Sequence, residues 1–437
     1  MKATSVLQPF VIALATSISN CSAAPTAAKS SDAIAQPADL TDTVGGYKSV
    51  AYFTAWSIFE REYNVWDAPA SKLTHLIYAF AQVASNGTVY YPGDQYADVS
   101  RVFTGHDSGY DGDGNLHGNV NQLFKIKKAN RNLKTILSIG GWGEKNFPQA
   151  ARTPQSREVF ATTAVELMKD GGFDGIDIDW EFPEDDEEGR NFALLLEMVR
   201  NTLDQYAVQH ASGHHFLLTV ASPAAPSTHM PLTDMDQYLD FWNVMTYDFS
   251  GSWDTTARHQ ANLYPSASFP DSTSYAADTG LTDYIARGIP VHKLVMGIPV
   301  YGHSFAGTDG LGQPFTGPSP TASHCWEAGS CDYKVLPKAG AEEIYDPAIG
   351  ASYSYDPITK EFTTYDSASV VIQKGEYIKA KGLGGAMFWE TSADKTGADS
   401  LIGTLFDTLG QDLEQTRNWL SYPESRYKNV KSGMQGE

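Results

Sequence analysis

The stretch that decides the fold is Phe173-Asp174-Gly175-Ile176-Asp177-Ile178-Asp179-Trp180-Glu181, in which acidic and apolar residues alternate. Successive side chains of a β-strand point to opposite faces, so Asp177, Asp179 and Glu181 are predicted to share one face at intervals of about 6.5–7 Å. The intervening apolar side chains then face covering helices. The pattern predicts a strand that is apolar on its outer face and carries a ladder of carboxyl groups on the other.

Seven further β-rich runs lie before and after this strand, and most are separated by longer helical stretches. The runs are Ser49–Phe53, Leu76–Phe80, Thr135–Gly141, Phe216–Ser222, Phe241–Asp248, Leu294–Tyr301 and Gly385–Glu390. Most are nearly continuous in apolar residues, as expected for parallel strands that are covered on both faces. Eight strands with intervening helices predict an α/β fold, the (β/α)8 TIM barrel. The alternative, an open doubly wound sheet, lacks the glycine-rich dinucleotide turn that would support it.

The length of 437 residues fits one barrel of roughly 250 residues with insertions. Tyr301 and the helix expected at Ser367–Lys381 are too far apart in sequence for an ordinary loop. The interval contains its own β-like pieces, so we expect a small α+β insertion domain over 303–365, between strand 7 and helix 7. The catalytic barrel is then expected over 44–302 and 366–410, followed by a C-terminal tail over 411–437.

The N-terminal region reads as a targeting segment. Residues 1–23 combine Lys2, an apolar stretch and small residues, which is typical of a secretory signal peptide. Residues 24–43 are rich in Ala, Ser, Thr and Pro and are predicted to be a flexible lead-in. A sequon at Asn86-Gly87-Thr88 marks Asn86 as a candidate glycosylation site. We therefore expect a secreted, extracellular protein.

Composition excludes some partners. The chain has 31 Lys and Arg residues against 52 Asp and Glu residues, a net charge of −21. Such a field repels nucleic acid and anionic membranes. No apolar run is long enough to span a membrane, and we expect a monomer. Aromatic residues make up 12% of the chain, which fits either a sugar ligand or an aromatic core.

Cysteine and acidic patterns give no metal site. Cys325 and Cys331 are two of only three cysteines, and in a secreted protein they are expected to close one small disulfide loop. No Cys/His cluster has zinc spacing. The acidic tract 107–115 superficially resembles a calcium loop, but Leu116 stands where that loop needs glycine. We therefore expect no metal and no cofactor.

Three carboxyl groups on one inward face are costly to bury together. Like charges raise the pKa of at least one of them, and that group can hold a proton at neutral pH. In a barrel the active site lies at the C-terminal ends of the strands, so Glu181, the outermost, is the expected general acid. The alternatives from the pattern alone are a solvated acidic strand and a metal cage.

The chain resembles a known family of enzymes. Asp174, Asp177, Asp179 and Glu181 fit the D-x-x-D-x-D-x-E signature of the chitinases of glycoside hydrolase family 18. Three further runs resemble that family's motifs on strands three, six and eight: Ser138-Ile139-Gly140-Gly141-Trp142, Met245-Thr246-Tyr247-Asp248 and Gly385-Ala386-Met387-Phe388-Trp389-Glu390. The resemblance covers most of Tyr47–Leu409 and is greatest to secreted fungal chitinases.

The resemblance implies retaining, substrate-assisted hydrolysis of β-1,4-linked N-acetylglucosamine in chitin and chito-oligosaccharides. Glu181 would protonate the glycosidic oxygen, and the substrate's own acetamide oxygen would attack the anomeric carbon to give an oxazolinium ion. Asp179 would stabilise the acetamide N–H, Asp177 would share a proton or hydrogen bond with Asp179, and Tyr247 would hold the acetamide oxygen. Glu181 would then activate the water.

The resemblance also implies a set of sugar-binding residues. Trp389 would form the floor under the cleaved sugar and Trp142 a stacking surface on its product side. The expected lining residues are Tyr52, Phe80, Met245 and Asp248, while Ser138, Gly140 and Gly141 shape the backbone near Asp177. One departure is His303, which stands where the family often has arginine. Two other functions remain open: a chitin-binding lectin and an endo-β-N-acetylglucosaminidase acting on protein-linked glycans.

Overall fold

A computed structural model describes residues 46–92, 95–107 and 113–434 of the chain. The predicted signal peptide over 1–23 and lead-in over 24–43 lie outside the described residues, as does most of the calcium-loop-like tract. Residues Val44–Glu437 belong to one compact unit.

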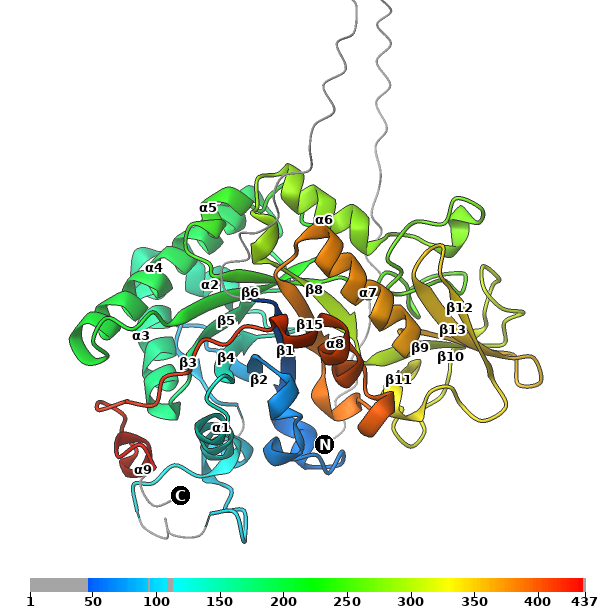
Figure 1. The fold of residues 1–437 in the computed structure, drawn as a ribbon. Coiled ribbons are helices and arrows are strands. Elements are labelled where there is room, and N and C mark those ends of the chain that lie inside the picture. Colours follow the sequence, from blue (N-terminus) through cyan, green and yellow to red (C-terminus); the bar gives the residue numbers. More distant parts are fainter. Residues whose placement is uncertain (1–45, 93–94, 108–112, 435–437) are drawn as a thin grey trace, which may run out of the picture. The chain divides into compact units, whose positions relative to one another are not determined.

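A closed barrel of eight parallel strands confirms the predicted fold (Figure 1). β1 pairs with both β15 and β2, which closes the sheet on itself. A ninth strand, β3, is antiparallel to β2 at its end. The strands of this sheet are β1 (Lys48–Thr54), β2 (His75–Val83), β3 (Val89–Tyr90), β4 (Lys134–Gly140), β5 (Gly175–Asp179), β6 (Leu217–Pro223), β7 (Phe241–Met245), β8 (Leu294–Pro299) and β15 (Gly385–Trp389).

Helices surround the barrel, as Figure 1 shows. They are α1 (Gly118–Ala129), α2 (Phe147–Arg152), α3 (Pro154–Gly171), α4 (Asp186–His210), α5 (Leu232–Asp236), α6 (Ala277–Ala286), α7 (Ala368–Lys381), α8 (Leu401–Leu409) and α9 (Lys428–Lys431). Shorter 3-10 and π turns are η1 (Ala55–Ile58), η2 (Val65–Asp67), η3 (Ala70–Lys72), η4 (Tyr96–Ser100), η5 (Pro270–Ser272), η6 (Val291–Lys293), η7 (Tyr333–Val335), η8 (Thr391–Ala393), η9 (Gly397–Asp399) and η10 (Gly410–Asp412).

Local sequence explains where the helices beside β5 begin and end. Thr153 caps α3 by accepting a hydrogen bond from the backbone N–H of Ser156, and Gly172 ends it in the left-handed conformation. On the outer face of β5, Trp180 stacks on Phe147 with ring centroids 5.3 Å apart. The apolar residues of β5 therefore pack against helices, which leaves the acidic face of the strand to the barrel interior.

The strand with the acidic ladder ends earlier than the sequence predicted. The expected strand ran to Glu181, whereas β5 ends at Asp179. The reason is its neighbour: Asp179 pairs with Gly140, the last residue of β4. β7 likewise ends at Met245 instead of Asp248. The outermost residues of both motifs therefore lie in loops at the barrel mouth.

A second sheet lies beside the barrel and is antiparallel (Figure 1, yellow to orange). Its order is β10 (Gly317–Pro318), β9 (Tyr301–Ala306), β14 (Glu361–Tyr365), β13 (Ala351–Asp356) and β12 (Glu342–Asp346), with β11 (Ser330–Asp332) also paired to β9. Phe305 and Phe362 are fully buried against one another. Cys325 forms a disulfide with Cys331, which lies in β11. The domain boundaries at 303 and 365 stay a prediction.

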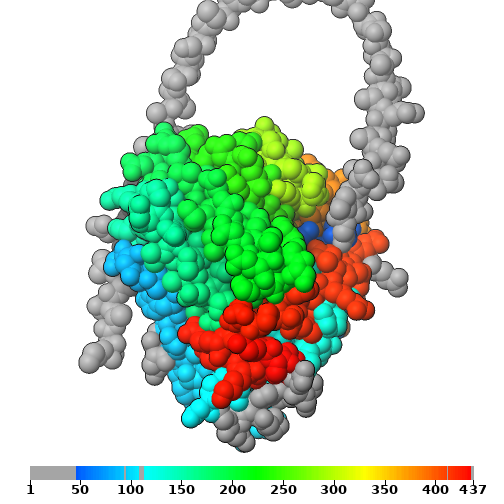
Figure 2. Space-filling model, turned by 90° about the vertical axis from the view of Figure 1, so that its left-hand side faces the viewer, coloured from blue at the N-terminus to red at the C-terminus, as the bar shows by residue number. Residues whose placement is uncertain are grey.

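The segment after α8 packs against the barrel and does not project from it. Figure 2 shows it in red on the surface, next to green residues, and Trp419 stacks on His214 with centroids 4.6 Å apart. Tyr422 is fully buried, and its hydroxyl donates to the backbone oxygen of Phe173 at 2.7 Å. This segment therefore covers the barrel where β5 begins.

Candidate active site

Asp177 lies at the centre of a hydrogen-bond cluster inside the barrel. The side chain is fully buried, and its carboxylate accepts hydrogen bonds from four strands. The donors are Tyr52 Oη at 2.9 Å, Ser138 Oγ at 2.7 Å, Thr219 Oγ1 at 2.6 Å and Asn243 Nδ2 at 3.3 Å. Burial raises the pKa of Asp177, while these donors oppose the rise by stabilising the ionised form.

Asp179, two residues further along β5, has a different environment. It is buried, and its Oδ1 has no hydrogen-bond partner in the described part of the chain. Burial, followed by the nearby charges of Glu181 and Asp177, raises its pKa well above the ordinary value. The two aspartates therefore differ. Hydrogen bonds from the protein stabilise the ionised form of Asp177, whereas Asp179 lacks such donors and favours the protonated form.

Glu181 follows β5 at the mouth of the barrel and is only partly buried. Burial, with a further contribution from the negative charge of Asp248, raises its pKa to about 7. A carboxyl group with that pKa holds a proton in mildly acidic solution and can give it to a substrate oxygen. The geometry thus puts one proton donor above two buried carboxyl groups.

Two residues that follow β7 meet this cluster. Tyr247 is nearly fully buried, and its pKa is raised by burial and by the charges of Asp248, Asp179, Glu181 and Asp177. Its hydroxyl has one weak protein contact, 3.9 Å from Met387 Sδ. Asp248 has a φ of 59°, and its exposed carboxylate accepts hydrogen bonds from Tyr301 Oη at 2.5 Å and His303 Nε2 at 2.8 Å.

A row of aromatic rings lines the mouth. Trp389 stacks on Phe80 with centroids 5.7 Å apart and lies 5.3 Å from the ring of Tyr52. The ring of Trp56, 46% exposed, is also near Phe80, with centroids 6.3 Å apart. Met245, Tyr247 and Trp389 belong to the same apolar cluster as Tyr52 and Phe80. The barrel interior thus offers flat apolar surfaces next to the acidic residues.

The loop after β4 depends on glycine. Gly141 has a φ of 90°, and its N–H donates to the backbone oxygen of Asp179 at 2.9 Å. A Cβ on Gly140 would lie 2.2 Å from that same oxygen, and a Cβ on Gly141 would lie 2.6 Å from the Phe80 ring. The next residue, Trp142, is 81% exposed and lines a groove of about 320 Å³. The loop backbone at Gly140 and Gly141 therefore packs closely against Asp179 and Phe80, and Trp142 follows it on the surface beside the mouth.

Other predicted residues lie elsewhere. Asp174 is at the opposite end of β5, where its carboxylate pairs with the buried Lys127 ammonium at 2.8 Å. The disulfide joins Cys325 to Cys331, which lies in β11 of the second sheet. Asn86 is exposed in a turn between β2 and β3. Asp174 therefore stabilises the base of the barrel and has no contact with the other motif acids.

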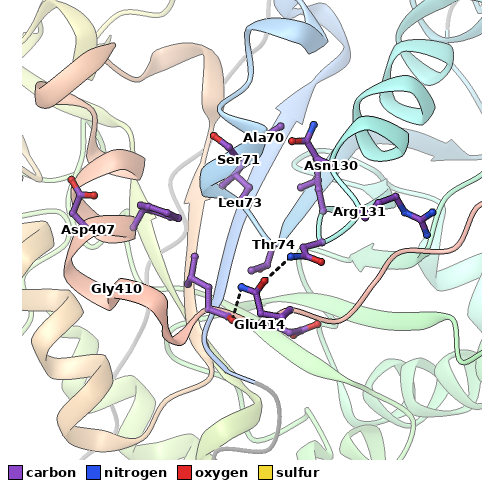
Figure 3. A pocket seen from close by; sticks show the side chains of 14 residues that line it. Ala70, Ser71, Leu73, Thr74, Asn130, Arg131, Asp407, Gly410 and Glu414 are labelled. Carbon is purple, nitrogen blue, oxygen red and sulfur yellow. Dashed lines mark hydrogen bonds between the residues drawn. The ribbon is translucent and has the colours of Figure 1, made fainter. Parts of the chain in front are cut away.

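A hollow of about 770 Å³ opens at the amino-terminal ends of β2 and β4 (Figure 3). Its polar side chains bind one another: Asn132 Nδ2 donates to Gln415 Oε1 at 2.6 Å, and Gln415 Nε2 donates to the Leu413 oxygen at 3.1 Å. Arg131 donates to Asn418 in the same region. This hollow lies at the end of the barrel that is opposite to the acidic ladder.

Sequence reasoning missed several residues of the site. Thr219 and Asn243 donate to Asp177, Tyr301 binds Asp248, and Trp56 extends the aromatic row. Strand register is the signal that reveals Thr219, because Asp177 pairs directly with it on β6. Trp56 and Tyr301 each lie two residues after the end of a barrel strand, β1 or β8, where site residues of such barrels gather.

Within the described ranges, no group of three or more His, Cys, Asp and Glu side chains is arranged to hold a metal ion. A search of the helices in the same ranges found none that is both long and apolar enough to cross a membrane.

Comparisons with known proteins agree with this geometry. A model of the family "Glycosyl hydrolases family 18" matches residues 48–394. Endochitinase 1 of Metarhizium robertsii is 47% identical over 409 residues, which cover 92% of this chain and 95% of the relative. Chitinase 1 of Aphanocladium album is 46% identical over 404 residues, covering 92% and 94% of the two chains.

Solved structures show the same fold. Chitinase ChiA74 from Bacillus thuringiensis superposes with a TM-score of 0.75 at 31% identity, over 83% of this chain and 70% of the other. A mutant chitinase from Cycas revoluta, solved in complex with (GlcNAc)4, superposes with a TM-score of 0.70 at 26% identity, over 83% and 99%.

Proposed function

This chain belongs to the glycosyl hydrolases of family 18, and we propose that it is a chitinase that hydrolyses β-1,4 linkages between N-acetylglucosamine units. The observation that carries the proposal is the ladder at the end of β5. A partly exposed carboxyl group with a pKa of about 7 stands above two buried carboxyl groups, and aromatic rings line the same mouth. The similar endochitinase and chitinase, and the related chitinase solved with (GlcNAc)4, support chitin and chito-oligosaccharides as substrates.

The proposed first step uses Glu181 as the acid. Its proton passes to the glycosidic oxygen, the bond from that oxygen to the anomeric carbon breaks, and the substrate's acetamide oxygen forms a new bond to that carbon. The resulting oxazolinium ion is positively charged and forms among these acidic groups, and its N–H donates a hydrogen bond to Asp179, whose unpartnered Oδ1 is available to it. Tyr247 offers its hydroxyl, held only weakly by Met387, to the acetamide oxygen.

In the second step, Glu181 is ionised and takes a proton from water as that water attacks the anomeric carbon. The carbon–oxygen bond of the oxazolinium ring breaks, and the acetamide is restored. Two displacements at one carbon retain the configuration. The oxygens of Asp177 are already occupied by four donors, and its charge acts on Asp179 by raising the pKa of that carboxyl group. No separate nucleophile of the protein is required.

We further propose where the substrate lies and where the enzyme works. Trp389, stacked on Phe80, forms the floor for the cleaved sugar, and Trp142 supplies a flat surface on the product side. β9 forms one wall of the cleft, since Tyr301 and His303 reach Asp248. The N-terminal sequence and the Asn86 sequon support secretion. We expect the enzyme to act as a monomer.

The proposal is tested with Glu181→Gln, assayed on an N-acetylglucosamine hexamer with detection of the product anomers. Glutamine keeps the shape but has no transferable proton, so hydrolysis is expected to fall by at least about 100-fold. Glu166→Gln, which changes an exposed carboxylate on α3, is the matched control and should keep full activity.

Products of the wild-type protein should carry the β configuration when first released. Inverted products would contradict the acetamide mechanism. Tight binding of the hexamer without cleavage would favour the lectin, and cleavage of glycoprotein glycans in preference to the hexamer would favour the endo-β-N-acetylglucosaminidase.

A further inference from the structure

Arg61, outside the acidic ladder, connects three segments at the barrel mouth. Its side chain is mostly buried, with 17% exposed, in the turn that follows η1. Nη1 donates to Asp332 Oδ1 at 2.8 Å and to Ser392 Oγ at 3.3 Å, and it pairs with Glu390 Oε1 at 3.3 Å. One guanidinium thus joins the end of β1, the segment after the disulfide and the residue that directly follows Trp389.

The ring of Trp326 adds to this contact. The Arg61 guanidinium lies 5.0 Å from the ring centroid, and Trp326 Nε1 donates to Asp332 Oδ2 at 3.0 Å. Trp326 lies inside the loop closed by the disulfide, and Asp332 directly follows Cys331. The disulfide loop and the residue that follows it therefore present an aromatic face and a carboxylate to the same arginine, a combination that suits a guanidinium better than an ammonium group.

Glu390 is the partner that relates Arg61 to the substrate floor. It is 5% exposed, and as the N-cap of η8 it accepts the backbone N–H of Ser392 on Oε2 at 2.9 Å. Glu390 directly follows Trp389 in the chain, so the contacts that fix Glu390 also restrain the backbone that carries Trp389. On the other side, η1 carries Trp56, and its ring completes the row with Phe80 and Trp389.

We propose that Arg61 is a positioning residue that holds Trp389 and Trp56 in register for sugar binding, by binding Glu390 and the disulfide loop at once. This inference rests on the proposed function, since it gives Trp389 the role of sugar floor. Arg61 itself does not contact the ladder of Asp177, Asp179 and Glu181. Removal of the Arg61 side chain should therefore weaken sugar binding and leave the proton donor, Glu181, unchanged.

The buried charge of Glu390 provides a signature that a purely structural role lacks. The charged and titratable groups around Glu390 are Arg61, Asp332 and Tyr63. Asp332 in turn pairs with Lys334 at 3.4 Å and lies 3.8 Å from His324 Nδ1. Burial raises the pKa of Glu390, and Arg61 opposes that rise. In a variant without Arg61, the buried Glu390 carboxylate lacks the positive charge of the guanidinium at high pH. At low pH Glu390 takes up a proton and becomes neutral, so the missing charge no longer matters.

The experiment compares wild type with Arg61→Gln in kcat and KM on an N-acetylglucosamine tetramer between pH 4 and pH 8. We expect the ratio of variant to wild-type kcat/KM to be near one at pH 4 and to fall about tenfold or more at pH 8, as expected for a misplaced substrate. In the Glu181→Gln background, tetramer binding measured by calorimetry at pH 8 should weaken by a similar factor.

Arg61→Lys keeps the charge but not the planar fork, so its deficit should be smaller and independent of pH. Arg426→Gln is the matched control, because Arg426 also pairs with an aspartate and lies over a tyrosine ring, but at the base of the barrel. It should leave kcat/KM unchanged at every pH.

Two results would overturn the inference: wild-type kinetics and binding in Arg61→Gln, or a deficit that does not vary with pH. If Arg61→Gln does not fold, Arg61→Lys decides, since unchanged tetramer binding in that variant contradicts a positioning role. Failure of the proposed function is recognised separately, because the wild-type protein would then not cleave the tetramer.

Discussion

At the scale of single residues, the environment of Glu181 makes a prediction about pH. Burial and the Asp248 charge raise its pKa to about 7, so the acid form is lost as pH rises through that value. We therefore expect kcat/KM to fall as the pH rises above about 7, because Glu181 then loses its proton. The other groups that face Glu181 are Asp179, Tyr247 and Tyr301, and none of them supplies a positive charge to oppose the rise.

Asp248→Asn removes one negative charge and should lower the pKa of Glu181. The alkaline limb of the kcat/KM profile is then expected to move to lower pH, by about one unit for a partly screened pair. Asp407→Asn, at the far hollow, is the control and should leave the profile in place. An alkaline limb that stays in place or moves to higher pH in Asp248→Asn would show that the charge of Asp248 does not act on Glu181.

At the scale of single residues, the direction in which the motif acids point was predictable from the sequence, but their hydrogen-bond partners were not. Alternation along one strand was enough to predict that Asp177 and Asp179 face inward, because the period of a strand is a local property. The partners of Asp177 were not predictable in the same way. Tyr52, Ser138, Thr219 and Asn243 come from four strands, so their convergence requires the barrel register and not the pattern of any one strand.

At the scale of elements, strand ends were predicted less well than strand positions. Apolar character continues past Asp179, but pairing stops there because β4 ends at Gly140. A strand end is set by its neighbour, which sequence periodicity does not describe. The contact of Asp248 with β9 was missed for the same reason, since Tyr301 and His303 belong to another sheet.

The loop after β4 gives a prediction at this scale. Gly140 and Gly143 both have a positive φ, of 116° and 88°, but only Gly140 has a neighbour that a Cβ would meet. Gly143→Ala should cost about 1 kcal/mol in the free energy of unfolding, from backbone strain alone. Gly140→Ala should cost clearly more and also lower kcat, because its Cβ pushes on the backbone of Asp179.

Urea unfolding and hexamer hydrolysis measure both effects on the pair of variants. Equal losses of stability and equal kcat values in the two would show that the close approach to Asp179 is not what glycine provides at position 140.

For the whole molecule, the number and order of strands were enough to predict a closed barrel, since eight buried parallel strands have few other arrangements. The path of the last segment was not predictable. Residues after α8 have no strong period, yet Trp419 and Tyr422 reach the base of β5. Their contacts are made with Asp174 and Phe173, which are about 245 residues earlier in the chain.

The two ends of β5 therefore have different tasks, and this division can be tested. Asp174 accepts hydrogen bonds from Lys127 Nζ at 2.8 Å, from the Thr135 N–H at 2.8 Å and from the Trp419 N–H at 2.7 Å. Asp174→Asn leaves the Lys127 ammonium buried without its counter-charge and should lower the free energy of unfolding by about 3 kcal/mol or more. Tyr422→Phe removes one hydroxyl from the same cluster and should cost about 1 kcal/mol.

Both variants should keep the wild-type KM, kcat and pH profile at temperatures where they are folded, because the proton donor and the aromatic row are at the other end of the barrel. Urea unfolding gives the two free energies, and hexamer hydrolysis gives the kinetics. A shifted pH profile in Asp174→Asn would show that the base of β5 acts on Glu181, and the first acid of the motif would then have a catalytic as well as a structural role.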